Sequence, residues 1–227
     1  MSSTFGGDER LAIFDRSGRR IGTKSRVEVH RDGDIHALVF LWAARVDARS
    51  HKRFLLQLRG RDGDPYRGQL DALAGGHVSA EEGQIDAVRR ECREETGVEL
   101  AVESLLPLGE RFLENPVGVC RRVFECAYLS LKPIHLEDVT FSSEANGFVE
   151  VELDELAALL DGQRDGIDGL ARTPQTGSAI QSIPITRGYF SAYAEPILEI
   201  FRLSIAAIAR YLDTGSLGKG IEEGVER

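Results

Sequence analysis

The segment from Gly76 to Val98 constrains the fold of this chain more than any other, because its residue types specify a short helix between two turns. Residues 85–95 carry apolar side chains at the i, i+3, i+7 spacing of a helix with one buried stripe. Gly97 stands where a C-terminal helix cap is expected. The segment is therefore predicted to form a loop, a helix and a loop. The predicted buried stripe consists of Ile85, Val88 and Cys92.

Three glutamates crowd one side of this predicted helix. Glu91, Glu94 and Glu95 stand at positions i, i+3 and i+4, and at about 100° per residue they share one arc of the helix. Three carboxylates so close together repel one another, and bound Mg²⁺ or Mn²⁺ would remove that repulsion. Zinc would favour His or Cys ligands instead. The alternative is a solvated acidic face, since charged runs usually face water.

Apolar stretches on both sides of the segment predict strands. An N-terminal hairpin is expected from strands at 11–15 and 20–29 with a turn between them. The continuous apolar run 37–44 fits a strand that is buried on both faces. The alternation of strands and helices predicts an α/β layered domain with a mixed sheet. Further strands are expected at 54–59, 105–113, 119–131 and 148–153, and a short helix at 154–160. Residues 70–73 are a short apolar stretch that leads into Gly75-Gly76.

The chain divides into four predicted parts. Residues 1–35 form the hairpin extension packed on the core, and residues 36–160 form the central domain. Residues 161–190 are rich in Gly, Asp, Thr and Gln and are interpreted as an irregular loop or lid. Residues 191–227 supply a long helix and a frayed tail. The apolar stripe of that helix is expected to cover the core, with a homodimer interface as the alternative.

Charge and cysteine content exclude some function classes. A formal charge of −9 argues against stable nucleic-acid binding, so a phosphate ligand would need local help from a small basic cluster or from bound cations. No apolar run reaches the roughly 18 residues that a membrane span needs, and residues 1–10 lack a secretory signal. An odd number of cysteines without CxxC spacing fits a reducing cytoplasm. The cysteines are Cys92, Cys120 and Cys126.

The spacing of the whole segment resembles the signature of the Nudix hydrolase superfamily at each of its defining positions. Gly76 is followed after five residues by Glu82, and after seven more by Arg90-Glu91-Cys92. Glu94-Glu95 and Gly97-Val98 complete the pattern at single-residue intervals. The resemblance extends from near Leu11 to about Leu156, and it implies an α/β/α sandwich with a long C-terminal helix.

The resemblance assigns roles to the residues of this Nudix box. It implies that Glu91, Glu94 and Glu95 hold catalytic Mg²⁺, with Mn²⁺ as a substitute, and that Gly76 offers a backbone carbonyl to one cation. Glu82, Arg90 and Gly97 are implied to be structural. The implied reaction is attack of a metal-activated water on one phosphorus of a P–O–P linkage.

Two residues outside the box are further candidates. Glu144 precedes the predicted strand at 148–153, and in many Nudix enzymes the general base lies on a loop outside the box. An ordinary loop glutamate is the alternative, and Glu91 is the other candidate base. Arg59, at the end of its predicted strand, could contact a phosphate or be a solvated arginine.

The N-terminal third resembles the isopentenyl-diphosphate isomerase-like branch of the superfamily. The isomerases place a catalytic cysteine before the Gly-His pair, where this chain has Gly75. They also use two metal-binding glutamates, whose places align here with Cys120 and Arg122. Three histidines match positions near the isomerase metal site, with hydrogen-bonded structural histidines as the alternative. They are His30, His36 and His77.

Cleavage of a diphosphate linkage in a nucleoside diphosphate derivative or a similar small molecule is the predicted function, as in a MutT-like pyrophosphatase. An isomerase is the first alternative and is disfavoured by Gly75. A non-catalytic Nudix module that binds a ligand is the second alternative. Such modules usually lose box glutamates, and this chain keeps all of them.

Overall fold

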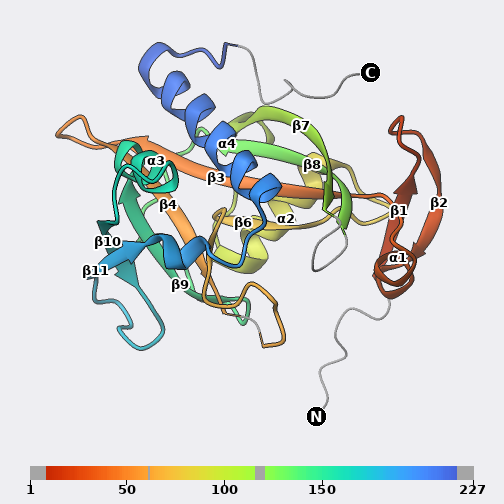
Figure 1. Cartoon of the computed structure of the whole chain (residues 1–227), viewed down its shortest axis with the longest axis horizontal. Helices are drawn as coiled ribbons and strands as arrows, with labels where there is room; N and C mark the ends of the chain where they lie inside the picture. Colours follow the sequence, from red (N-terminus) through yellow and green to blue (C-terminus); the bar gives the residue numbers. More distant parts are fainter. Residues whose placement is uncertain (1–8, 61, 116–120, 219–227) are drawn as a thin grey trace.

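The computed structural model describes residues 9–60, 62–115 and 121–218 (Figure 1). The first part is a separate two-stranded hairpin and a helix, formed by β1 (Arg10–Phe14), β2 (Arg20–Ser25) and α1 (Arg26–Asp32). The central strands and helices are β3 (His36–Val46), β4 (Lys52–Arg59), β5 (Leu70–Asp71), β6 (Ala74–His77), α2 (Gln84–Thr96), η1 (Val102–Ser104), β7 (Leu105–Asn115) and β8 (Arg121–Ser130). The last elements are β9 (Ala145–Glu152), α3 (Leu153–Leu160), β10 (Gly166–Arg172), β11 (Gln181–Thr186), η2 (Arg187–Phe190) and α4 (Glu195–Thr214).

A mixed sheet forms the centre of the molecule. Its strand order is β11-β10-β9-β4-β3-β8-β7, with β5 paired to β4 and β6 paired to β3. The β3–β8 pair is parallel, and the other pairs are antiparallel. α3 and α4 pack on one face, and α2 packs on the other (Figure 1). These observations confirm the predicted α/β architecture, the N-terminal hairpin and the long C-terminal helix.

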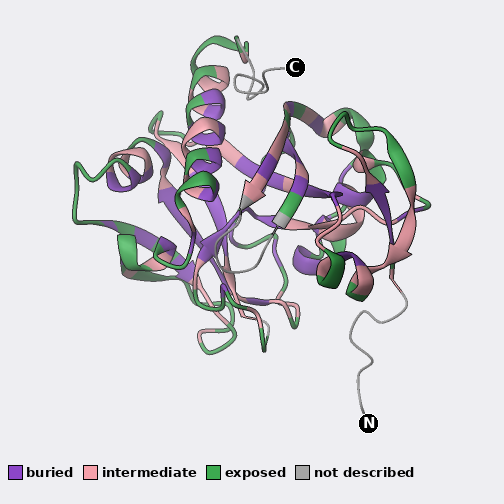
Figure 2. Cartoon of the chain, turned by 45° about the vertical axis from the view of Figure 1, so that its right-hand side comes forward, coloured by how far each residue is buried: buried purple, intermediate pink, exposed green. Residues whose placement is uncertain are grey.

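Alternation along β3 explains why this strand reads as one apolar run. Leu38 and Trp42 belong to the core beneath α3 and α4, whereas Val39, Leu41 and Ala43 belong to the core beneath α2. Successive strand residues point to opposite faces, so a strand covered on both faces needs apolar residues at nearly every position. Figure 2 shows the buried residues concentrated in this central sheet.

The interpretation of residues 161–190 as an irregular loop is wrong, because β10 and β11 form there and extend the sheet at one edge. The alternating pattern is weak because Gly169 occupies one of the inward positions of β10. A Cβ at Gly169 would lie 2.9 Å from the side chains of Ile185 and Val149, so the neighbouring strands leave room only for glycine.

Two smaller expectations also need correction. Residues 26–29 begin helix α1 rather than continue the return strand, because the side chains of Ser25 and Glu28 form a reciprocal capping box. Ile85 is 40% exposed, and Ala87 takes its place in the buried stripe with Val88 and Cys92. The expected frayed tail lies partly in α4, which runs to Thr214, and partly outside the described residues.

α4 packs its apolar stripe on its own sheet. Ile197, Phe201, Ile205 and Ile208 are buried in the core that includes Trp42. Pro196 lies in the first turn of α4, where its missing N–H costs no helical hydrogen bond. None of the helices in the described ranges is both long enough and apolar enough to cross a membrane.

Candidate active site

A cavity of about 330 Å³ opens between α2, the β6 strand and the N-terminal half of α4. The carboxylates of Glu91, Glu94 and Glu95 line it on one side, as does Glu144. Apolar side chains line the opposite side, including Trp42 and Phe201. The structure therefore brings the three box glutamates and Glu144 together in one cavity.

The three box glutamates differ in their surroundings. The side chain of Glu94 is 53% exposed, whereas that of Glu91 is 13% exposed. Burial raises the pKa of Glu91 to about 7, with further contributions from the charges of Glu94 and Glu144 and opposition from Arg90. Burial raises the pKa of Glu95 to about 8, and the charges of Glu91 and Glu144 add to this shift. Burial and neighbouring like charges thus disfavour the ionised forms of both carboxylates.

Hydrogen bonds fix Glu95 at the floor of the pocket. Its carboxylate accepts a hydrogen bond of 2.9 Å from the side chain of Gln57 on β4. It also accepts a longer one, of 3.3 Å, from the backbone N–H of Gly75 on β6. Glu95 therefore joins helix α2 to two strands of the sheet.

Arg90 ties the loop before α2 to the helix. Its guanidinium donates to Glu82 at 2.6 Å and to the backbone carbonyl of His77 at 3.0 Å. It also donates to Glu91 at 2.8 Å and to Glu94 at 3.3 Å. Glu82 in turn accepts from the backbone N–H of Ser79 at 2.9 Å. These contacts are of the kind that a structural role for Glu82 and Arg90 requires.

Glycines allow the close approaches around the helix. Gly97 ends α2 in the left-handed conformation with φ +74°, and a Cβ there would overlap the hydroxyl of Thr140. Gly76 lies against Glu91, and a Cβ there would overlap the carboxylate. Gly75 is equally confined, because a Cβ would lie 2.8 Å from the ring of Phe40 and 2.9 Å from the carbonyl of Val39. The backbone as it stands has no room for a cysteine at this position.

The donor set fits a hard divalent cation. The side chains of Glu91, Glu94 and Glu95 line the same cavity. The charge of Glu94 acts on Glu91 and that of Glu91 on Glu95, and such repulsion is the kind that a bound cation removes. Because Gly76 has no side chain, its backbone can lie against the carboxylate of Glu91 in the wall of the same cavity.

Arg59 lies in the cavity wall but is already engaged. Its guanidinium donates to Asp64 at 2.6 Å and to Asp71 at 2.8 Å. The guanidinium carbon also lies 5.9 Å from the centroid of the Tyr66 ring. With two carboxylates in contact, Arg59 offers less positive charge to a phosphate than its position alone suggests.

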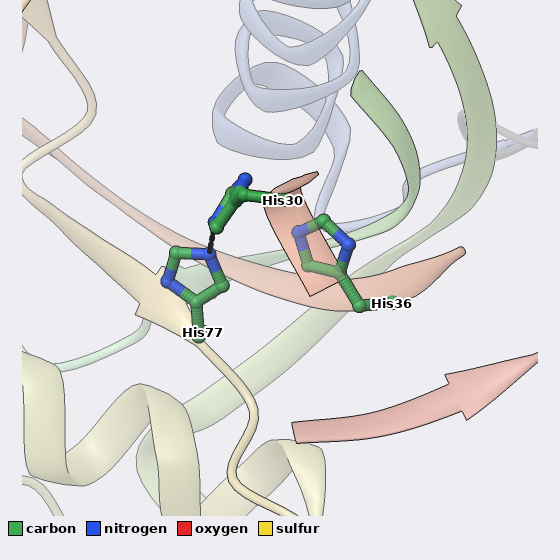
Figure 3. A group of neighbouring side chains, drawn as sticks. All are labelled: His30, His36 and His77. Carbon is green, nitrogen blue, oxygen red and sulfur yellow. Dashed lines mark hydrogen bonds between the residues drawn. The ribbon is translucent and has the colours of Figure 1, made fainter. Parts of the chain in front are cut away.

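The three histidines form a compact cluster from α1, β3 and β6 (Figure 3). One ligand atom from each of His30, His36 and His77 lies within 4.8 Å of the other two. The Nε2 atoms of His30 and His77 are 3.0 Å apart, at hydrogen-bond distance. The cluster adjoins the main cavity through His77. Three closely spaced ring nitrogens are a donor set that suits a transition metal. The hydrogen bond between His30 and His77 suits the alternative, a structural role for the histidines.

Several pocket residues escaped the sequence analysis. Glu125 is buried at 6% exposure and lines the cavity from β8. Glu9 and Arg26, from the N-terminal extension, pair at 3.0 Å in the cavity wall. No local sequence signal marked these residues, because long-range contacts bring them to the site.

Two positions align with metal-binding glutamates of the isomerases. Cys120 lies outside the described residues, and Arg122 pairs with Glu114 at 2.9 Å.

Comparisons with known proteins agree with this geometry. Residues 39–167 match the family model described as the NUDIX domain. The chain is 34% identical over 163 residues to an uncharacterized Nudix hydrolase from Clostridium acetobutylicum, a match covering 70% of this chain and 78% of that protein. It is 35% identical over 143 residues to Nudix hydrolase 3 of Arabidopsis thaliana, covering 60% of this chain but only 18% of the plant protein. A crystal structure from Deinococcus radiodurans has the same fold, with a TM-score of 0.52 at 21% identity, over 68% of this chain and 90% of that one.

Proposed function

The chain belongs to the Nudix hydrolase family, and we propose that it uses Mg²⁺, or Mn²⁺ in its place, to cleave the P–O–P linkage of a small diphosphate. The observation that carries the proposal is the meeting of Glu91, Glu94 and Glu95 with Glu144 in one cavity. A volume of about 330 Å³ lies at the lower end of the range typical of small-molecule sites. A nucleoside diphosphate derivative or a similar small molecule is the proposed substrate class.

The box residues would hold the cations in this proposal. Glu91, Glu94 and Glu95 supply carboxylate ligands, and Gly76 supplies a backbone carbonyl. When bound, the cations lower the pKa of a water molecule and neutralise charge on the phosphate oxygens. Arg90 keeps the loop and the helix in register by its contacts with Glu82 and with the backbone of His77.

Glu144 is the proposed general base, which accepts the proton of the attacking water. Its charge already acts on Glu91 and Glu95, so its carboxylate lies within electrostatic reach of the box. Glu91 is the alternative base. Arg59 has a lesser role in phosphate binding, because Asp64 and Asp71 hold its guanidinium.

A substrate screen tests the proposed reaction. The protein is incubated with Mg²⁺ and a panel of nucleoside diphosphates, nucleoside triphosphates and nucleotide-sugar conjugates. Release of phosphate or of a nucleoside monophosphate is expected, and EDTA should abolish it. Conversion of isopentenyl to dimethylallyl diphosphate without phosphate release would overturn the hydrolase proposal in favour of the isomerase alternative.

The assignment to the isomerase-like branch is the finer part of this proposal. The N-terminal extension and the cluster of His30, His36 and His77 support it. The crowded position of Gly75 argues that the chain keeps this framework without isomerase chemistry. A non-catalytic module is disfavoured because all three box glutamates are present and face the cavity.

The histidine cluster leads to a measurement that does not depend on activity. If it is a metal site, the protein incubated with Zn²⁺ and then desalted should retain about one ion per chain, measured by mass spectrometry of the metal content. His77→Asn should remove that ion. His135→Asn, outside the cluster, is the matched control. A parent protein that retains no such ion would assign the three histidines to hydrogen bonding alone.

Compartment and assembly complete the proposal. Cys92 and Cys126 are buried free thiols, which suits the proposed cytoplasmic location. Because α4 buries its stripe against its own sheet, a homodimer would need another surface.

A further inference from the structure

The loop between β8 and β9 carries Glu144 into the cavity, and an arginine from β10 fastens that loop. Nη1 of Arg172 donates hydrogen bonds of 2.8 Å to the backbone carbonyls of Leu136 and Val139. Its Nε donates at 3.0 Å to the carbonyl of Gly177, in the turn that follows β10. One guanidinium thus joins the β10–β11 hairpin to the loop that precedes Glu144.

The same guanidinium also contacts the loop closer to Glu144. Its central carbon lies 5.1 Å from the centroid of the Phe141 ring, at cation–π distance. Phe141 in turn stacks on Phe148 of β9, with centroids 6.3 Å apart. Phe141 is three residues from Glu144, so Arg172 and Phe148 hold the loop immediately before the candidate base.

Two backbone contacts complete the attachment of the loop. The N–H of Thr140 donates to the carbonyl of Thr96 at the end of α2, at 2.7 Å. The N–H of Gly60 donates to the carbonyl of Glu144 at 2.8 Å. These contacts fix the backbone at the two ends of 140–144, and Arg172 fixes the stretch that leads into it.

The attachment of this loop decides where Glu144 lies in the cavity. Its side chain lines the same cavity as Glu91, which accepts a hydrogen bond from Arg90, and Glu95, which accepts one from Gln57. Arg172 is not among the cavity-lining residues, so it can hold the loop without touching a substrate.

We propose that Arg172 is a positioning residue that holds Glu144 at the distance from the box glutamates that the reaction requires. The proposal rests on the proposed function, in which Glu144 accepts the proton of the attacking water. Loss of Arg172 should therefore act through Glu144 alone. It should lower kcat and leave substrate binding nearly unchanged.

A double-mutant cycle with Arg172→Lys and Glu144→Gln tests this inference, using the panel compound that the parent cleaves fastest in Mg²⁺. Lysine keeps the charge but cannot donate in the planar fork of a guanidinium. Arg172→Lys is expected to lower kcat about 10-fold, with KM within about twofold of the parent. In the Glu144→Gln background the same change should alter kcat by less than about twofold, because the group that it positions is gone.

Arg89→Lys is the matched control, since Arg89 also fastens a backbone carbonyl, that of Leu100 at 2.7 Å, but away from Glu144. Equal losses of kcat from Arg172→Lys in both backgrounds would overturn the inference. An unchanged kcat in Glu144→Gln alone would instead remove Glu144 as the base, which is a failure of the proposed function.

A second measurement needs no substrate. Amide hydrogen exchange in Mg²⁺ should be faster across 136–146 in Arg172→Lys than in the parent, and unchanged there in Arg89→Lys. Unchanged exchange in Arg172→Lys would overturn the inference even if every compound in the panel proved inert.

Discussion

Replacing Glu94 by glutamine is expected to lower kcat at saturating Mg²⁺ by at least about 100-fold, because a lost metal ligand removes several kcal/mol of transition-state stabilisation. Glu94 is the most informative of the box glutamates to change. Its side chain is 53% exposed and accepts a 3.3 Å hydrogen bond from Arg90, so glutamine should fit without disturbing the core. Glu95, by contrast, is bonded to Gln57 and buried, so its replacement would mix chemistry with folding.

The matched control is Asp86→Asn on the same helix. Asp86 carries the same charge, and its side chain is 68% exposed outside the cavity. Both variants remove one negative charge from α2, so a non-specific electrostatic effect would appear in both. Steady-state kinetics over a Mg²⁺ titration, with Mn²⁺ binding measured by calorimetry, separates weakened metal binding from a slower reaction. A Glu94→Gln enzyme as active as the parent would show that the metal assignment is wrong.

The helix of the site could be predicted from sequence because its signals are local. Helix α2 runs over Gln84–Thr96, one residue beyond the predicted range at each end. Gly97 takes the left-handed conformation that its position predicted. Caps and helical periodicity operate within about four residues, so one sequence carries enough information to place them.

The opposite wall of the cavity could not be predicted, because distant segments build it. Trp42 on β3 meets Phe201 on α4 with ring centroids 5.2 Å apart, and nothing near either residue specifies the contact. The sequence analysis left Arg59 available for a phosphate, because its partners were not apparent from the sequence. Asp64 lies in the loop after β4 and Asp71 lies in β5, and no local pattern pairs either with Arg59. Such features depend on tertiary packing, which overrides local propensity.

Gly76 is the second position where we expect a large loss of kcat. Gly76→Ala places a methyl group where the carboxylate of Glu91 now lies. Glu91 cannot simply swing aside, because Arg90 holds it at 2.8 Å. We therefore expect a displaced ligand and a fall in kcat of about 100-fold, since a misplacement of about 1 Å at a reacting centre can cost that much.

Gly83→Ala is the control that separates this clash from the general effect of adding a methyl group. Gly83 lies in the loop between β6 and α2, at the N-cap of α2, and no atom outside its immediate neighbours lies within 4 Å of a Cβ built there. That variant should keep the parent kcat. Because Gly76 pairs with Val39 in a strand, where alanine is tolerated, Gly76→Ala should remain folded by circular dichroism. Parent-like kinetics in Gly76→Ala would mean that Glu91 occupies a different position in the active enzyme, where a methyl group at Gly76 does not meet it.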